Sequence, residues 1–331
     1  MKVAVATAAQ NFPQFKPNRP ALTPPPSSAA CRRHLSVGLR RNRQIPLKSH
    51  QSQTNPQTVT KSAGDDDGIP NEHVKILAKF KSRHNYIRVL QVSRAADHPL
   101  AGSRLLLLDA PGNIHSISFL FKSLTNAYYD VFATLPPILP AGPVGILGFG
   151  AGSAARILLD LYPQTSIHGW EIDPSVLAVA REYFGLEKLE KKHSGRLVIH
   201  TGDALDADVP NGFAAVLVDL FSKGCVIPEL QDAATWEKLR RTLRKGGRIM
   251  VNVGGDCVEP EDIRKDGGAI MEATLKAMQE VFPGEVNVLR VGSRKDDSAV
   301  AMTGGLPDAG RWKAVLTRPL KFYVDLWEPY G

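Results

Sequence analysis

The sequence predicts an α/β fold: a mostly parallel sheet covered by helices on both faces, preceded by a small antiparallel β-unit. The first observation is that short apolar runs alternate with helical segments from residue 143 onward, which is typical of such a sheet. The second is that strand-like runs follow one another within residues 84–120, with a turn between them. We therefore expect the β-unit and a helix in residues 65–140, and the parallel sheet in residues 141–331.

The antiparallel unit is predicted to contain at least two strands. Partial alternation of apolar and polar residues predicts a strand over 86–92, and a run of leucines predicts another over 104–109. The segment Ala110-Pro111-Gly112-Asn113 then has the composition of a turn. We expect residues 117–134 to form a helix that ends before Pro136-Pro137.

In the alternating part of the chain, one helix start is marked by its sequence. Asp173 precedes Pro174, which places an N-capping carboxylate before a proline in the first helical turn. The other elements are predicted from the alternation of apolar strands and helical segments. The predicted strands are 144–147, 166–171, 196–200, 213–219, 247–253, 286–291 and 298–302, and the predicted helices are 153–161, 174–184, 232–244 and 268–281.

The positive charge of the chain is concentrated at its N-terminus. The chain has 331 residues and a formal net charge of +8, but residues 1–64 contain ten Lys or Arg and no Asp or Glu. Residues 65–331 therefore hold 31 basic and 33 acidic residues, a net charge of −2. A general nucleic-acid-binding surface is not expected on a body with this charge balance.

Residues 1–64 have the composition of an organelle transit peptide. They contain eight prolines, eleven Ser or Thr and no acid. The prolines at 24–26 and the Ser/Thr content favour a chloroplast, because a mitochondrial leader would form a cleaner amphipathic helix. We expect a disordered transit peptide directed to the plastid stroma, cleaved near Ala29-Ala30-Cys31 or near residue 60. A disordered basic tail is the alternative.

Two classes of protein are excluded by what the sequence lacks. No apolar run reaches the roughly 18 residues that a membrane helix requires, so we expect no membrane association. The three cysteines, Cys31, Cys225 and Cys257, include no Cys-x-x-Cys pair. We therefore expect no disulfide framework, no structural zinc and no bound metal.

A glycine-rich turn follows the first strand of the alternating part. Gly148, Gly150 and Gly152 stand between this strand and a helix, where the absence of Cβ atoms lets a ligand approach the backbone. The helix N-terminus adds N–H donors and the positive end of the helix dipole. Glu171 ends the next strand, 19 residues after Gly152, and a carboxylate there can accept both hydroxyls of a ribose. These features indicate a nucleotide site.

Two more acids end neighbouring strands of the predicted sheet. Asp203 follows the third strand and Asp219 ends the fourth, so both are expected at the edge where open parallel sheets bind ligands. A bound NAD would leave both acids without a role, and its fingerprint requires Gly where this chain has Ser153. S-adenosylmethionine gives both a role, because its adenine amino group requires an acceptor and its sulfonium and ammonium require anionic or carbonyl neighbours.

These motifs resemble the spermidine-synthase-like branch of the S-adenosylmethionine-dependent methyltransferase superfamily, in an organelle-targeted plant form. The resemblance implies a Rossmann-like class I methyltransferase sheet, S-adenosylmethionine as cofactor, and Asp219 as the catalytic candidate. This carboxylate would take a proton from the acceptor or only hold the methionine amine. The matching segments are 146–152, 171–174, 180–184, 202–204, 218–222, 227–228 and 243–247. The cofactor-binding residues that it implies are Gly148, Gly150, Gly152, Glu171, Ile172, Asp203, Ala204 and Asp219.

The chain departs from spermidine synthases at the positions that hold the amine groups. Ala151 stands where the family has an acid in the glycine-rich motif, and Ser222 replaces the second acid after strand four, followed by Lys223. His115 stands in place of a Gln, with about two extra residues, Ala110-Pro111, before it. Binding a dicationic diamine without paired carboxylates costs several kcal/mol per ammonium group. Polyamine chemistry of the usual type is therefore disfavoured.

We consequently expect a methyltransferase with an unidentified, small-molecule acceptor. Two alternatives stay open: an aminopropyltransferase with an altered acceptor site, and a noncatalytic binding protein that kept the fold. His115 is a candidate second base, and Trp170 is expected to pack in the core. The sequence leaves open whether the protein is a homodimer.

Overall fold

The computed structural model describes residues 2–3, 69–255, 258–290 and 299–331. All of the described residues belong to one compact unit. The predicted leader lies outside them, except for β1 (Lys2–Val3), which pairs antiparallel with β2 (Ile69–Pro70). Cys31 and Cys257 also lie outside the described residues, whereas Cys225 is a buried free thiol.

The central sheet has eight strands in the order β16-β14-β15-β13-β10-β7-β8-β9. The five strands from β13 to β9 are parallel, and the other three pair antiparallel beside β13. This arrangement confirms the predicted sheet. The strands are β7 (Val144–Leu147), β8 (Ile167–Glu171), β9 (Leu197–Thr201), β10 (Phe213–Val218), β13 (Leu243–Gly254), β14 (Val286–Arg290), β15 (Ala299–Thr303) and β16 (Trp327–Pro329).

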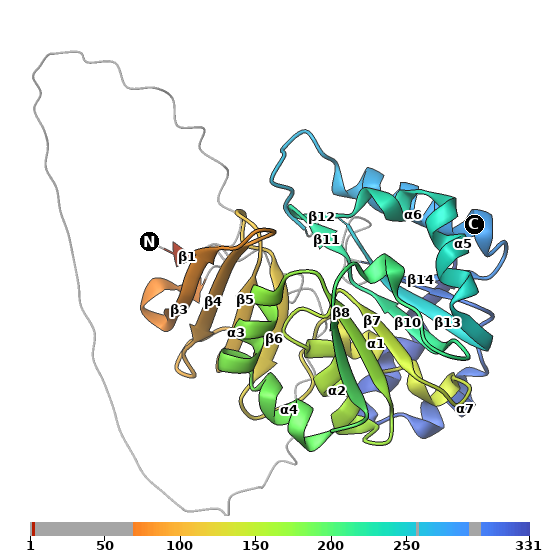
Figure 1. Cartoon of the computed structure of the whole chain (residues 1–331), viewed down its shortest axis with the longest axis horizontal. Helices are drawn as coiled ribbons and strands as arrows, with labels where there is room; N and C mark the ends of the chain where they lie inside the picture. Colours follow the sequence, from red (N-terminus) through yellow and green to blue (C-terminus); the bar gives the residue numbers. More distant parts are fainter. Residues whose placement is uncertain (1, 4–68, 256–257, 291–298) are drawn as a thin grey trace, which may run out of the picture. The chain divides into compact units, whose positions relative to one another are not determined.

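Helices cover both faces of this sheet (Figure 1). All six residues of β10 are buried: Ala215 and Leu217 face one apolar cluster, and Val216 and Val218 face the other. A strand that is apolar on both sides is what a doubly covered parallel sheet requires. One cluster includes side chains of α1 (Tyr128–Phe132), α2 (Ser153–Leu161), α3 (Pro174–Phe184), α4 (Leu186–Lys192) and α7 (Ala309–Val315), and the other includes those of α5 (Ala233–Arg241) and α6 (Gly267–Val281).

The predicted N-terminal β-unit is a four-stranded antiparallel sheet in the order β3-β4-β5-β6. The predicted helix over 117–134 is wrong, because residues 114–119 form a strand and the helix is confined to α1. Ile117 pairs with Leu105 and both are buried, whereas Asn126 has a φ of 57°, which interrupts a helix. The strands are β3 (Val74–Lys81), β4 (Tyr86–Val92), β5 (Ser103–Leu107) and β6 (Ile114–Phe119).

Short elements complete the described chain. β11 (Phe221–Ser222) and β12 (Cys225–Val226) form a hairpin whose two turn residues, Lys223 and Gly224, both have positive φ, 52° and 70°. The 3₁₀ helices are η1 (Asn71–His73), η2 (Pro136–Ile138), η3 (Ala204–Asp206), η4 (Pro228–Gln231) and η5 (Arg318–Leu326). Within the part of the chain that the structure describes, no helix is both long and apolar enough to cross a bilayer.

Candidate functional site

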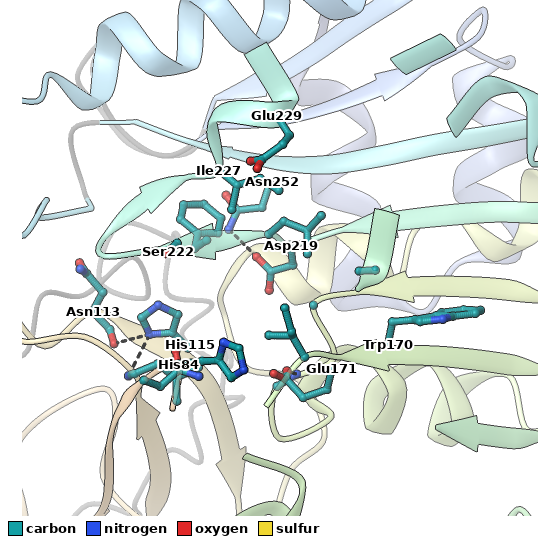
Figure 2. Close-up of a pocket in the computed structure, with 18 of the residues that line it drawn as sticks. His84, Asn113, His115, Trp170, Glu171, Asp219, Ser222, Ile227, Glu229 and Asn252 are labelled. Carbon is teal, nitrogen blue, oxygen red and sulfur yellow. Dashed lines mark hydrogen bonds between the residues drawn. The ribbon is translucent and has the colours of Figure 1, made fainter. Parts of the chain in front are cut away.

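A cavity of about 390 Å³ lies at the carboxyl ends of the parallel strands (Figure 2). Its wall combines residues that follow β7, β8, β9 and β10 with residues of the N-terminal β-unit. In Figure 2, Asn113, His115 and Ser222 lie to one side of Asp219, and Glu171 and Trp170 lie to the other. We refer to the part of the wall around Glu171 and Trp170 as the Glu171 end, and to the part around Asn113, His115 and Ser222 as the other end.

In the glycine-rich turn after β7, other atoms of the protein occupy the space that a Cβ on Gly148 or Gly150 would need. Gly148 has a φ of 86°, and a Cβ there would overlap the carbonyl oxygen of Asp219. A Cβ on Gly150 would lie 2.7 Å from Ser116 Oγ, which accepts a hydrogen bond from the Ala151 N–H at 2.9 Å. Gly148 and Gly150 line the cavity, whereas Gly152 starts α2 and is not part of its wall. Only glycine fits this turn at Gly148 and Gly150.

Glu171, at the end of β8, is buried and holds the two neighbouring turns. Its Oε2 accepts from the Gly150 N–H at 2.9 Å, and its Oε1 accepts from the Asp173 N–H at 3.0 Å. Burial raises the pKa of Glu171, although these backbone donors oppose the shift. An ionised carboxylate has about four acceptor sites, so Glu171 can also accept a hydrogen bond from a hydroxyl donor.

Asp173 connects this turn to the N-terminal β-unit. Its Oδ1 caps α3 by accepting from the Ser175 N–H at 2.9 Å. Its Oδ2 accepts from the Ser82 hydroxyl and from Asn85 Nδ2, the latter at 2.8 Å. Burial opposes ionisation, but the hydrogen bonds outweigh it and lower the pKa of Asp173. The β3–β4 turn is thereby fixed at the cavity, where His84 and Asn85 form part of the wall.

Asp219, directly after β10, is held by two side chains. Tyr128 of α1 donates its hydroxyl to Oδ2 at 2.6 Å, and Asn252 of β13 donates Nδ2–H to Oδ1 at 3.0 Å. Burial raises the pKa of Asp219 to about 6, and the two hydrogen bonds limit the rise. The pKa of Tyr128 lies well above its usual range because the phenol is buried beside this carboxylate. At neutral pH the pair is therefore a carboxylate and a neutral phenol.

The remaining predicted residues line the same end as Glu171. Asp203 is exposed and caps η3 through Oδ1, which accepts from the Leu205 N–H at 2.9 Å. Ala204 and Ile172 belong to the same wall, and 49% of Ile172 is exposed, so it offers an apolar surface to a ligand. Trp170 is 93% buried, as expected for a core residue, yet it also forms part of the cavity wall.

At the other end of the cavity, Ser222 stands where the pattern of spermidine synthases has an acid, and Glu229 belongs to the same wall. Ser222 lines the cavity, and Ala151 is buried under Ser116. Burial lowers the pKa of His115, whose Nδ1 lies 2.9 Å from the Asn113 carbonyl and whose Nε2 lies 3.7 Å from Asp109 Oδ2. The neutral imidazole is therefore favoured at this end.

The charges of the cavity wall have one sign. Four carboxylic residues line the cavity, and no Lys or Arg is among the described residues of its wall. Because a cavity of this charge repels anions and attracts cations, it favours a ligand with positive charge. The four residues are Glu171, Asp203, Asp219 and Glu229.

The structure brings seven of the eight predicted site residues together around one cavity. Gly152 is the exception, because it is the N-cap residue of α2 and does not line the cavity. Sequence reasoning missed Tyr128 and Asn252, which hold Asp219 from α1 and β13. Tyr128 fell within a segment predicted as one long helix, and a strand pattern alone gives no sign that Asn252 contacts an acid.

The chain was compared with known proteins. It is 28% identical over 211 residues to a probable polyamine aminopropyl transferase of Bifidobacterium longum, which spans 63% of this chain and 42% of that protein. It is 25% identical over 215 residues to the eEF1A lysine and N-terminal methyltransferase of Bos taurus. This match covers 58% of this chain and 29% of that protein. The predicted resemblance to spermidine-synthase-like and S-adenosylmethionine-dependent methyltransferase proteins is confirmed, whereas the organelle-targeted plant form stays a prediction. The chain thus covers less than half of either relative, and no protein-family model matches it.

Solved structures show the same fold. A probable spermidine synthase from Corynebacterium glutamicum superposes with a TM-score of 0.55 at 20% identity, over 73% of this chain and 87% of that chain. The Rossmann-like class I sheet with its N-terminal β-unit is therefore confirmed.

Proposed function

We propose that this chain is an S-adenosylmethionine-dependent transferase that moves a methyl group to an acceptor still to be identified. The observation that carries the proposal is the row of acids Glu171, Asp203 and Asp219, which follow β8, β9 and β10 and line one cavity. A sulfonium cofactor suits this wall of carboxylates better than an anionic dinucleotide does. One relative is named a methyltransferase and the other an aminopropyl transferase, so both names support a group-transfer enzyme, and only the first supports methyl transfer.

The residues of the Glu171 end fit this cofactor. Glu171 would accept the ribose hydroxyls, since it lines the cavity and an ionised carboxylate has about four acceptor sites, more than its backbone donors use. Asp203 would accept from the adenine amino group beside the apolar surface of Ile172. Gly148 and Gly150 line the cavity, so the methionine portion would lie against their backbone.

Asp219 would take the proton that the acceptor loses. When bound, S-adenosylmethionine supplies a methyl group that is already activated by the sulfonium. The chain has to align the acceptor, exclude water and accept a proton. A pKa of about 6 leaves the Asp219 carboxylate mostly ionised at pH 7, so it can accept a proton from an amine or hydroxyl. Tyr128 and Asn252 fix the direction of its two oxygens.

Aminopropyl transfer is the second candidate, and one observation favours it. The cavity wall offers no described Lys or Arg to pair with the carboxylate of S-adenosylmethionine, and decarboxylated S-adenosylmethionine lacks that carboxylate. The structure also places Glu229 in the wall, whereas Asp232 caps α5. Against this candidate stand Ser222 and Ala151, where paired acids would hold a diamine and the aminopropyl amine.

The two candidates are separated by their products. The purified chain is incubated with putrescine and decarboxylated S-adenosylmethionine, and the polyamines are measured by mass spectrometry. We expect no detectable spermidine, because two missing charge-assisted contacts would reduce turnover by about two to four orders of magnitude. Robust spermidine formation would replace methyl transfer by aminopropyl transfer, and loss of that activity in Glu229→Gln would identify the acid responsible.

A further inference from the structure

The turn that contains the two extra residues, Ala110-Pro111, is rigidly built. Asp109 is 2% exposed, and its Oδ1 accepts from the Gly112 and Asn113 N–H groups at 2.9 and 3.0 Å. Its Oδ2 accepts from Asn113 Nδ2 at 2.6 Å. A buried carboxylate that accepts three hydrogen bonds within one turn fixes the direction of the Asn113 side chain.

Asn113 then binds a segment 146 residues further along the chain. Its Oδ1 accepts from the Glu259 N–H at 2.9 Å, and its Nδ2 donates to the Glu259 carbonyl at 2.8 Å. The side-chain amide thus pairs with Glu259 as a neighbouring strand would. Beside it, the Ala110 N–H donates to Glu261 Oε1 at 2.9 Å, so the inserted turn contributes a second contact.

The tip of the β11–β12 hairpin completes this arrangement. The Glu261 N–H donates to the Lys223 carbonyl at 3.0 Å. Gly224 packs so closely that a Cβ there would overlap the Glu259 carbonyl oxygen and lie 3.0 Å from Asn113 Nδ2. Three segments that are distant in sequence therefore meet at one point on the rim of the cavity.

We propose that Asn113, Gly224, Glu259 and Glu261 form a clasp, and that Asn113 is its positioning residue. The hairpin leads into residues 227–229, and Phe221, Ser222 and residues 227–229 all line the cavity. By holding the hairpin tip, the clasp keeps residues 221–229 against the cavity and sets how long a nucleotide stays bound. The nature of that nucleotide rests on the proposed function.

Two pairs of variants test the clasp in the full chain. Asn113→Leu removes the two hydrogen bonds between the Asn113 side chain and Glu259 at nearly constant volume. Its control is Asn287→Leu, because Asn287 is also buried and donates to a backbone carbonyl, that of Gly304 at 2.9 Å, outside the cavity wall. Gly224→Ala displaces the hairpin. Its control is Gly246→Ala, which has a similar φ, 77° against 70°, but no atom within 4 Å of the new Cβ.

The first measurement is the dissociation rate of S-adenosylhomocysteine and S-adenosylmethionine, followed by stopped-flow displacement. We expect both clasp variants to release the nucleotides about tenfold faster, the change that corresponds to one net hydrogen bond. We expect the control variants to stay within about twofold of the unmodified chain, even though Asn287→Leu lowers its melting temperature. Equal rates in clasp and control variants would overturn the proposal.

The second measurement needs no ligand. Amide hydrogen exchange of residues 221–229 should be faster in Asn113→Leu and Gly224→Ala than in either control. If the unmodified chain binds neither nucleotide, the proposed function fails and hydrogen exchange alone decides the clasp. Unchanged exchange at residues 221–229 in both clasp variants would contradict the clasp in either case.

Discussion

Asp219 is held by two side chains that come from distant parts of the chain. Tyr128 lies 91 residues before it, and Asn252 lies 33 residues after it. Both donate hydrogen bonds to the carboxylate, which stabilises its ionised form and opposes the effect of burial. The balance between burial and hydrogen bonding therefore determines the pH range in which this acid carries a charge.

Tyr128→Phe should move that pH range upward. In the unmodified chain we expect the affinity for S-adenosylmethionine to fall below a pH of about 6, because protonated Asp219 no longer attracts positive charge. Removing the Tyr128 donor removes a contact that lowers the pKa, so the fall should begin about one pH unit higher. Calorimetric titration across pH 5–8 measures the shift.

The matched control for this change is Tyr162→Phe. Tyr162 is a half-buried phenol that donates to the Ala133 carbonyl at 3.0 Å, and it does not line the cavity. Tyr162→Phe should leave the pH dependence of the affinity for S-adenosylmethionine unchanged. A profile of Tyr128→Phe that coincides with the unmodified chain would show that Tyr128 does not affect the ionisation of Asp219.

Glu171→Ala should weaken S-adenosylmethionine binding by about 1.5–3 kcal/mol, which corresponds to about 10- to 150-fold, because the ribose loses a charge-assisted acceptor. Glu171→Gln retains one acceptor oxygen and should lose less. Glu190→Ala, which breaks an exposed ion pair with Arg181, should have no effect on binding. An unchanged dissociation constant in a folded Glu171→Ala protein would remove the ribose assignment.

At the scale of elements, the start of α3 joins the two sheets. Asp173 caps this helix and also accepts from Ser82 and Asn85 of the β3–β4 turn. Asp173→Ala should therefore lower the free energy of unfolding by the roughly 0.5–2 kcal/mol of a lost cap, plus the loss of the contacts to the turn. Urea denaturation measures the change.

Asp232→Ala measures how much free energy of unfolding is lost when only a helix N-cap is removed. Asp232 caps α5 by accepting from the Ala234 N–H at 2.9 Å, and it is exposed. We expect Asp173→Ala to cost at least about 1 kcal/mol more than Asp232→Ala, because two further side-chain donors lose their partner. Equal costs would mean that the contacts to the β3–β4 turn do not stabilise the fold.

The elements that could be predicted from the sequence are those with strong local signals. Helix α2 lies at its predicted bounds, 153–161, and α3 begins at Pro174 after its Asp cap. The helix predicted over 117–134 failed because β6 is defined by its pairing with β5, a contact that local periodicity does not contain. The short β11–β12 hairpin was missed for the same reason.

The same distinction between local signals and long-range contacts applies to the residues of the candidate site. Glu171, Asp203 and Asp219 could be placed together from sequence, since the carboxyl ends of parallel strands meet at one edge of a sheet. Tyr128 and Asn113 could not, because they reach the site only when the N-terminal unit and α1 pack against that edge. Contacts between units depend on packing rather than on a local pattern.

At the scale of the whole molecule, basic and acidic residues are distributed unevenly along the chain. Residues 1–64 carry ten basic and no acidic residues, whereas the remaining residues have a net charge of −2. Fused to a fluorescent reporter, residues 1–64 should direct it into plastids, because they are basic, rich in Ser and Thr and free of acids. Confocal microscopy of leaf cells checks this, and fluorescence confined to the cytosol would make the segment a basic tail.

The central claim is that the acid-lined cavity binds S-adenosylmethionine, and calorimetric titration of the purified chain tests it most directly. Four carboxylic residues without a described Lys or Arg in the wall predict saturable binding at one site per chain, weakened as the salt concentration rises. Decarboxylated S-adenosylmethionine is titrated in parallel. No binding of either nucleotide would contradict the account and favour a noncatalytic protein that kept the fold, and binding of the decarboxylated form alone would contradict methyl transfer.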